Sequence, residues 1–183
     1  VIAYGGRSID DFGPKYLNSS DSVLYKKNRN LYFTKEFITE TKKKGYVFLV
    51  EGYFDVLSLN KLGFSNAASP SGTALTLQQL ESVARYTKKI LICFDNDEAG
   101  LKATERVLEI KNQVSKQLEI HCLNLPSEFK DISEVFETNP EAFKDILKNN
   151  EEIVEFLLNK FLKEDTNKKN VFNYFRKITG KLS

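Results

Sequence analysis

The 183-residue sequence has little of what several large enzyme classes require. It contains one histidine, His121, two cysteines, Cys93 and Cys122, and no methionine. Serine-protease and zinc-hydrolase chemistries lean on histidine, so one histidine inside an expected strand argues against both. Two cysteines are too few for a disulfide framework or a zinc site. Cys93 lies within the apolar run 90–94, which is typical of a buried core side chain.

Long apolar runs are also missing. No segment approaches the roughly 20 apolar residues of a membrane span, and the first residues lack the basic flank and apolar stretch of a secretory signal. We therefore expect no membrane partner. Because the sequence has no methionine even at position 1, we expect a segment of a longer protein.

The net charge of +2 says little about partners by itself. The distribution of the basic residues says more, because they gather at 26–29, at 42–44 and at 168–169. Such clusters are commonly solvated surface, and they also suit contacts with phosphate groups.

Strands and helices alternate through the middle of the chain. The continuous apolar runs at 46–50 and 90–94 predict strands buried on both faces. Shorter strands at 66–68 and 118–125 complete the pattern, with a helix through Leu57, Leu59 and Leu62 that ends at Gly63 and helices at 76–87 and about 98–114. Thr76 is the N-cap candidate of the helix at 76–87. This alternation predicts an α/β fold with a mostly parallel sheet flanked by helices.

The two ends of the chain differ from this middle part. Residues 1–30 predict short strands joined by loops, and the spacing of Phe33 and Phe37 predicts one helix over 31–44 that ends at Gly45. After Pro126 the periodicity is wholly helical. We expect boundaries that divide the chain into residues 1–44, 45–138 and 139–183, the last being a helical subdomain.

Two of the expected buried strands end in acidic residues. Glu51 follows the strand at 46–50, and Asp95 and Asp97 follow the strand at 90–94. Ligands of open α/β sheets bind at the carboxyl ends of parallel strands, so Glu51 can converge on the aspartate pair. Asp95 and Asp97 are two residues apart, so both side chains leave an extended backbone on the same face.

Three carboxylates this close repel one another unless a cation neutralises them. Oxygen ligands without His or Cys favour Mg²⁺ or Mn²⁺, which bridge to substrate phosphates in phosphoryl transfer. A simpler interpretation is that Asp97 is the N-cap of the helix that begins at Glu98 and that Glu51 is an ordinary loop acid. The spacing alone leaves both interpretations open.

Small residues accompany these acids. Gly52, Gly72 and Gly100 are either turn and packing glycines or positions where the backbone approaches phosphate groups closely. Thr73 either donates its hydroxyl to a phosphate or only starts a turn.

A series of motifs, in this order along the chain, resembles bacterial-type, DnaG-like DNA primases. The motifs are Tyr4-Gly-Gly-Arg7, Pro14-Lys-Tyr-Leu-Asn-Ser19, Lys27-Asn-Arg-Asn-Leu-Tyr32, Glu51-Gly-Tyr-Phe-Asp-Val56, Gly72-Thr-Ala-Leu-Thr76 and Asp95-Asn-Asp-Glu-Ala-Gly100. In that family the last three belong to a Toprim domain, a fold shared with type IA and type II topoisomerases and some nucleases.

The resemblance implies the Toprim catalytic-core fragment of a primase. Residues 1–44 would be the C-terminal part of the N-terminal core subdomain with a connecting helix, residues 45–138 the Toprim domain, and residues 139–183 the helical subdomain. The catalytic and metal-binding acids would be Glu51, Asp95 and Asp97, with Asp55 and Asp131 as outer metal-binding acids. The nucleotide- and DNA-binding residues would be Arg7, Lys15, Asn18, Lys27, Arg29, Gly72 and Thr73. For Arg7 and Lys15 the alternative is a surface salt bridge.

The activity implied is metal-dependent, DNA-templated synthesis of short RNA primers for DNA replication, a nucleotidyl transfer from ribonucleoside triphosphates that uses Mg²⁺ or Mn²⁺. The partners implied are a single-stranded DNA template, the nucleotides, and a replicative helicase bound through a domain absent from this chain. Zinc would occur only in a module that is likewise absent. The expected location is the cytoplasm, at a bacterial replisome. The abundance of Lys, Asn, Phe and Ile suggests an A+T-rich genome, which also leaves an organelle of a eukaryote open.

Some features depart from this family or suit others. The family usually shows Asp-Pro-Asp where this chain has Asp131-Ile-Ser133, so the second acid of one metal subsite is missing, and Pro70 replaces a more usual Ser or Thr. A topoisomerase needs a tyrosine nucleophile, and none can be assigned. A nuclease and a primase–helicase fusion stay open. A non-catalytic Toprim-like module would predict loss of one of the three acids, and all three are present.

Overall fold

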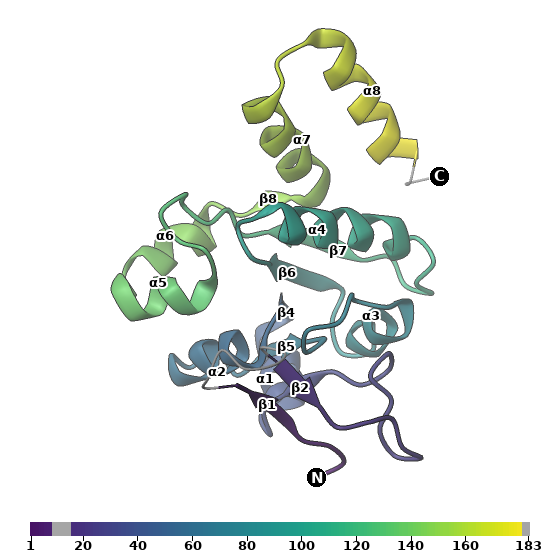
Figure 1. Cartoon of the computed structure of the whole chain (residues 1–183), viewed down its shortest axis with the longest axis vertical. Helices are drawn as coiled ribbons and strands as arrows, with labels where there is room; N and C mark the ends of the chain where they lie inside the picture. The colour runs from purple at the N-terminus through teal and green to yellow at the C-terminus, as the bar shows by residue number, and fades with distance from the viewer. Residues whose placement is uncertain (9–15, 181–183) are drawn as a thin grey trace.

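A six-stranded sheet lies at the centre of the computed structural model, which describes residues 1–8 and 16–180 (Figure 1). The strand order is β3-β5-β4-β6-β7-β8, and the four inner strands are parallel. The inner strands are β4 (Tyr46–Val50), β5 (Ala67–Ser69), β6 (Lys89–Cys93) and β7 (Glu119–Cys122). The expected α/β class with a mostly parallel sheet is confirmed.

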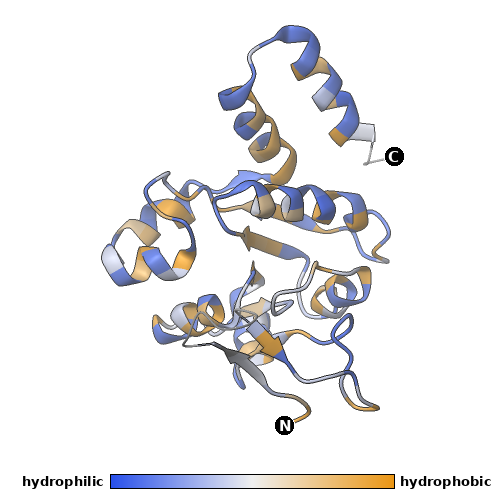
Figure 2. Ribbon diagram, in the orientation of Figure 1, coloured by the Kyte–Doolittle hydropathy of each residue, from blue (hydrophilic) through white to orange (hydrophobic). Residues whose placement is uncertain are grey.

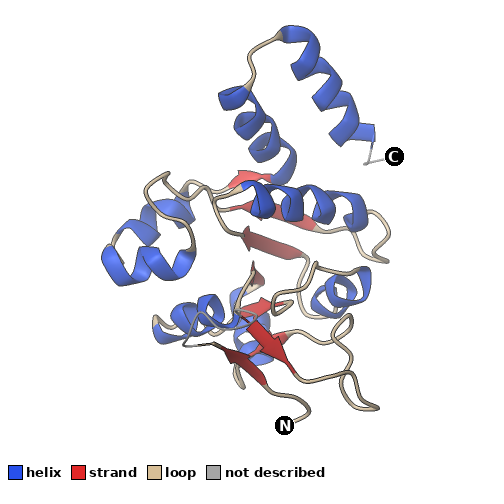
Figure 3. Ribbon diagram, viewed as in Figure 1, coloured by secondary structure: helices blue, strands red, loops and turns tan. Residues whose placement is uncertain are grey.

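Helices cover both faces of this sheet (Figure 3). They are α1 (Phe37–Lys44), α2 (Tyr53–Lys61), α3 (Leu77–Ala84), α4 (Glu98–Lys111), α5 (Ile132–Thr138), α6 (Ala142–Lys148), α7 (Ile153–Glu164) and α8 (Lys168–Thr179). A separate antiparallel ribbon joins β1 (Gly5–Arg7) to β2 (Tyr16–Asn18). No helix within 1–8 and 16–180 is long and apolar enough to span a membrane.

The alternation of side chains along β4 explains the two cores. Val47 and Leu49 point to one face, where they pack with residues of α1, α3, α4 and α7. Phe48 and Val50 point to the other face, where α2, α5 and α6 supply the partners. The strands β4 and β6 are therefore apolar on both sides, which Figure 2 shows for β6, and Cys93 is buried as expected.

The predicted helix over 31–44 is wrong in its first part. Tyr32–Phe33 forms the edge strand β3, which pairs antiparallel with β5, and α1 begins only at Phe37. The spacing of Phe33 and Phe37 is nevertheless meaningful, because the two rings stack with centroids 4.6 Å apart. Pairing satisfies the backbone groups of β5 that an open sheet edge would expose.

The wholly helical interpretation after Pro126 is also wrong at one place. Glu151–Glu152 forms β8, which pairs antiparallel with β7 at the other edge of the sheet. Two consecutive glutamates carry no apolar periodicity, so only the backbone pairing reveals this strand. From β8 the chain enters α7, whose buried Ile153 and Leu157 belong to the same core as β4 and β6. The two boundaries between the three predicted parts of the chain stay a prediction.

Candidate functional site

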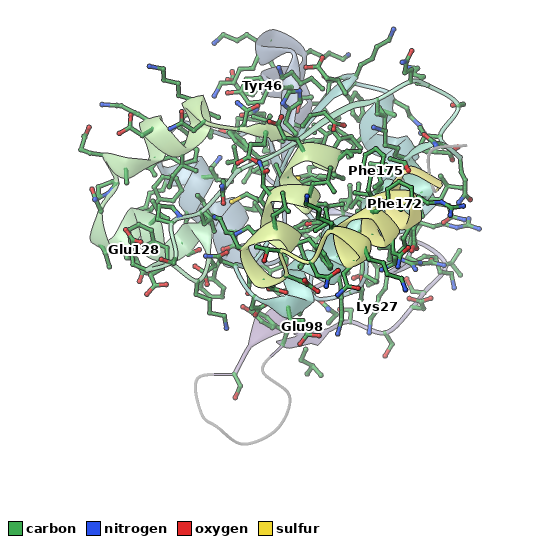
Figure 4. All side chains as sticks on the ribbon, turned by 90° about the horizontal axis from the view of Figure 1, so that it is seen from above. Lys27, Tyr46, Glu98, Glu128, Phe172 and Phe175 are labelled. Atoms are coloured by element: carbon green, nitrogen blue, oxygen red, sulfur yellow. The ribbon has the colours of Figure 1, made fainter. Side chains whose placement is uncertain are left out.

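Glu51 and Asp95 meet at the carboxyl end of the sheet. The parallel strands β4 and β6 pair in a register that sets Val50 opposite Cys93, so the residues that follow each strand are neighbours. Glu51 Oε1 accepts a hydrogen bond of 3.0 Å from the backbone N–H of Asp95. In Figure 4, Tyr46, at the start of β4, and Glu98, which lies beyond the end of β6, are on opposite sides of the molecule. The predicted convergence of these two acids is therefore present.

Five acidic residues line one pocket of about 180 Å³ at this edge: Glu51, Asp55, Asp95, Asp131 and Glu137. Asp55 lies in the first turn of α2 and accepts a hydrogen bond from the N–H of Gly52 at 2.9 Å. Asp131 is the N-cap of α5 and accepts one from the N–H of Glu134 at 2.9 Å. Helix starts thus hold the two outer acids beside the strand ends.

The pocket disfavours full ionisation of these acids. Burial raises the pKa of the Asp95 carboxyl to about 7, and the charges of Glu51, Asp55, Asp131 and Asp97 add to the rise. Burial also raises the pKa of Glu51 and of Asp55, which hydrogen bonds from neighbouring groups partly oppose. Since a bound cation removes this repulsion, the chemistry of the donor set fits a hard divalent ion.

The expectation for Asp97 has a different outcome. Its exposed side chain accepts hydrogen bonds from the N–H groups of Ala99 and Gly100, both at 3.0 Å, so it caps α4. The capping interpretation of Asp97 is therefore confirmed.

Among the described residues, no group of three or more His, Cys, Asp or Glu side chains is placed to hold a metal ion. The metal-binding roles that the resemblance implies for Glu51, Asp55, Asp95, Asp97 and Asp131 stay predictions.

Ser133 occupies the position where the resembling family has a second aspartate. Its hydroxyl donates to Asp55 Oδ1 at 2.8 Å and accepts from the hydroxyl of Ser58 at 3.1 Å. A neutral donor therefore stands where another carboxylate would add repulsion. The sequence had marked Ser133 only as a missing acid, and its role in tying α5 to α2 becomes visible in three dimensions.

The turn after β5 forms the rim of the same pocket. Ser71 and Gly72 both have positive φ angles, 63° and 78°, and both line the pocket. The Ser69 hydroxyl fixes this turn, because it donates to the carbonyl of Glu51 at 2.6 Å and accepts from the N–H of Ser71 at 2.9 Å. The Thr73 hydroxyl donates to the Pro70 carbonyl at 2.9 Å, as the turn interpretation of Thr73 expects.

Asn18 reaches this turn from β2. Its Nδ2 donates to the carbonyl of Ser71 at 3.0 Å, and its Oδ1 accepts from the hydroxyl of Tyr53. Of the other residues predicted to bind nucleotide or DNA, Lys15 lies outside the described residues, and only the backbone of Arg7, in β1, is described.

Lys27 and Arg29 lie in a loop that α3 holds by its first turn. The buried side chain of Gln79 donates to the carbonyls of Lys27 and Asn30 at 2.8 and 2.9 Å. Thr76, the N-cap of α3 as predicted, also donates its hydroxyl to the carbonyl of Asn28 at 2.6 Å. Figure 4 shows Lys27 on the same side of the molecule as Glu98. The sequence gave no signal for the role of Gln79.

Gln79→Leu is expected to loosen this basic loop. The change leaves two carbonyls without their donor, which costs about 1–3 kcal/mol of stability. Urea unfolding measures that loss, and hydrogen exchange should show faster exchange at residues 27–30. The control is Gln78→Leu on the exposed side of the same helix, with an expected effect within about 0.5 kcal/mol. Equal effects of the two changes would contradict the role of Gln79.

Comparisons with known proteins agree on one family. The family description "DNA primase catalytic core, N-terminal domain" matches residues 1–38, and "Toprim-like" matches residues 48–136. The DNA primase of Aquifex aeolicus is 36% identical over 179 residues, which cover 96% of this chain and 35% of that relative. The DNA primase of Neisseria meningitidis is 39% identical over 150 residues, which cover 81% of this chain and 25% of the relative. The chain thus spans about a third or less of these relatives.

Solved structures give the same result. The zinc-binding and RNA polymerase domains of the Aquifex aeolicus primase superpose with a TM-score of 0.78 at 34% identity, covering 97% of this chain and 44% of that one. A DnaG primase catalytic domain bound to single-stranded DNA superposes with a TM-score of 0.75 at 28% identity, covering 90% of this chain and 52% of that one.

Proposed function

Because the chain belongs to the family of DNA primase catalytic cores, we propose that it forms the catalytic part of an enzyme that synthesises short RNA primers on single-stranded DNA. The observation that carries the proposal is the meeting of Glu51 and Asp95 at neighbouring strand ends, in a pocket that three further acidic residues line. The reaction would be the transfer of a nucleotidyl group from a ribonucleoside triphosphate to a 3′-hydroxyl.

In this proposal Glu51 and Asp95 hold Mg²⁺ or Mn²⁺, with Asp97, Asp55 and Asp131 as further acids of the site. The bound ion would neutralise developing charge on the phosphates, which is the main requirement of phosphoryl transfer. The chain's own contribution is positioning. The N–H of Asp95 fixes the carboxylate of Glu51, and Ser133 fixes that of Asp55.

The template and nucleotide phosphates would contact the basic and small residues around this pocket. Lys27 and Arg29 would supply charge from the loop held by Gln79, and Arg7 and Lys15 from the N-terminal segment. Gly72 and Thr73 belong to the turn beside the acids, and Asn18 contacts this turn from β2. The single-stranded DNA in the structure of the DnaG catalytic domain supports a template of this kind.

RNA synthesis tests the proposal. The protein is given single-stranded DNA, labelled ribonucleoside triphosphates and Mg²⁺ or Mn²⁺, beside an Asp95→Asn variant. Short labelled RNA that depends on template and metal, and that is absent with the variant, is the expected result. Cleaved or protein-linked DNA without RNA would instead assign the chain to nucleases or topoisomerases.

Lys27→Gln and Arg29→Gln are each expected to weaken DNA binding without changing its sequence preference. Each phosphate contact releases condensed counterions, so log affinity falls as log salt concentration rises. Each change should reduce the magnitude of this negative slope by about 1. Fluorescence anisotropy with labelled single-stranded DNA at several salt concentrations measures the slope. Lys148→Gln, which removes the charge of an exposed lysine of α6, is the control and should leave the slope unchanged. An unaltered slope in the two loop variants would remove this loop from the DNA-binding surface.

A further inference from the structure

Asn96, between Asp95 and Asp97, joins the loop after β6 to the loop that precedes α5. Its N–H donates to the carbonyl of Lys130 at 2.7 Å. Its side-chain Nδ2 lies 3.3 to 3.4 Å from three more carbonyls of that loop, those of Leu125, Pro126 and Phe129. The second loop leads directly into Asp131, so Asn96 controls the spacing between two acid-bearing segments.

Lys160 reaches Asn96 from α7, in the C-terminal part of the chain. Its Nζ donates to Asn96 Oδ1 at 2.9 Å and lies 5.3 Å from the centre of the Phe156 ring. Both Lys160 and Asn96 line a pocket of about 470 Å³ that also includes Asp95 and Asp97. The helical segment thus contacts the acid-bearing loop through a specific polar pair.

These contacts determine the orientation of the Asn96 amide. Lysine can only donate hydrogen bonds and carbonyls can only accept them. If the Asn96 amide were rotated by half a turn, the donor Nδ2 would face the Lys160 ammonium group and the acceptor Oδ1 would face the carbonyls. Lys160 therefore selects the rotamer in which Nδ2 faces the loop before α5. Removing Lys160 removes the constraint on one end of the amide while leaving every acid in place.

We infer that Asn96 and Lys160 are positioning residues for the metal: Lys160 orients the Asn96 amide, and Asn96 holds the loop that bears Asp95 against the loop that leads into Asp131. The inference rests on the proposed function, because it takes these acids to be metal ligands. Groups that orient metal ligands typically contribute about 10- to 100-fold to metal affinity.

A role of Lys160 through its charge and a role through positioning predict opposite changes in cation affinity when Lys160 is replaced. If Lys160 acted only through its positive charge, its removal would make the acidic site more negative and would strengthen cation binding. If it acts by orienting Asn96, its removal weakens cation binding. Lys163, an exposed lysine on the same helix, provides a matched control for the charge.

The test is the affinity of the protein for Mn²⁺ alone, measured from the electron paramagnetic resonance signal of the free ion. Lys160→Met should bind Mn²⁺ about 10-fold more weakly, and Asn96→Leu at least as weakly. Lys163→Met should stay within about 2-fold of the unmodified protein, and Lys160→Arg, which keeps a donor, should recover most of the loss. Asp95→Asn should lose tight binding.

The outcomes separate the inference from the proposed function. Unchanged or tighter Mn²⁺ binding by Lys160→Met, with binding lost in Asp95→Asn, overturns the inference and leaves the metal site standing. The same holds if Lys160→Met lowers the melting temperature without changing the affinity, since that is a merely structural effect. Unchanged binding by Asp95→Asn overturns the proposed function itself.

Discussion

Asp95→Asn is expected to abolish RNA synthesis and, at the same time, to stabilise the metal-free protein at and above neutral pH. The loss of activity should reach about 1,000-fold or more, because a metal ligand supports several kcal/mol of charge stabilisation in the transition state. The gain in stability follows from the site itself. The carboxyl of Asp95 is half-buried among other acids, so its ionised form is unfavourable in the folded protein. Asparagine has nearly the same shape and carries no charge, so it avoids this repulsion.

The pH dependence of stability distinguishes this account from a loss of structure. The pKa of Asp95 rises from 3.8 to about 7 on folding, so the folded state binds the proton more tightly than the unfolded state. The associated stability is complete below pH 4 and is lost as the pH rises to about 7. At this half-exposed position, after screening by solvent, we expect a loss of about 1–2 kcal/mol.

Urea unfolding at pH 4 and at pH 8 without divalent metal measures this difference. Asp95→Asn should gain stability over the unmodified protein at pH 8 and gain little at pH 4. Saturating Mg²⁺ should stabilise only the unmodified protein, because ligand binding to the folded state adds to its stability. A variant less stable than the unmodified protein at pH 8 would show that Asp95 contributes favourable contacts rather than repulsion.

Gly100→Ala is expected to have the second large effect. A Cβ atom at position 100 would lie 2.0 Å from the carbonyl oxygen of Asp95 and 2.9 Å from its carbonyl carbon. Both are backbone atoms, so either α4 or the acid-bearing loop must move. The capping of Ala99 and Gly100 by Asp97 opposes movement of the helix. We expect about 1–3 kcal/mol of destabilisation and about a 100-fold loss of activity, since displacement of catalytic groups by about 1 Å has that consequence.

Gly180→Ala is the matched control for this change. Among residues 1–8 and 16–180, no atom other than those of its chain neighbour lies within 4 Å of a Cβ at Gly180, and its φ angle of −62° suits alanine, so stability should change by less than about 0.5 kcal/mol. Urea unfolding and RNA synthesis of both variants measure the two effects. Unimpaired synthesis by Gly100→Ala would show that the close approach of α4 to Asp95 is dispensable.

The elements that could be predicted from the sequence are those whose apolar side chains follow a run or a regular spacing. The apolar runs of β4 and β6 predict buried parallel strands. Glu51 and Asp95, which follow these strands, must then lie at the same edge of the sheet. The strands β3 and β8 could not be predicted, because two-residue edge strands are defined by backbone pairing rather than by a pattern of side chains.

The site follows the same division. Glu51 and Asp95 could be found because each follows a strand, and the capping role of Asp97 was one of two interpretations that its position allowed. The contacts of Gln79, Ser133 and Asn96 could not be found, because each joins segments at least 29 residues apart in the sequence. Such polar contacts leave no periodic signal, and only the folded chain brings their partners together.

Cleavage of the chain by iron tests the central claim, a divalent-metal site at the acidic edge of the sheet, most directly. Fe²⁺ replaces Mg²⁺ at oxygen-ligand sites, and with ascorbate and peroxide it cuts the nearest backbone. We predict cuts near residues 51–55, 95–97 and 131 that excess Mg²⁺ suppresses and that Asp95→Asn loses. Cuts elsewhere, or the same cuts in Asp95→Asn, would contradict a metal site built on these acids.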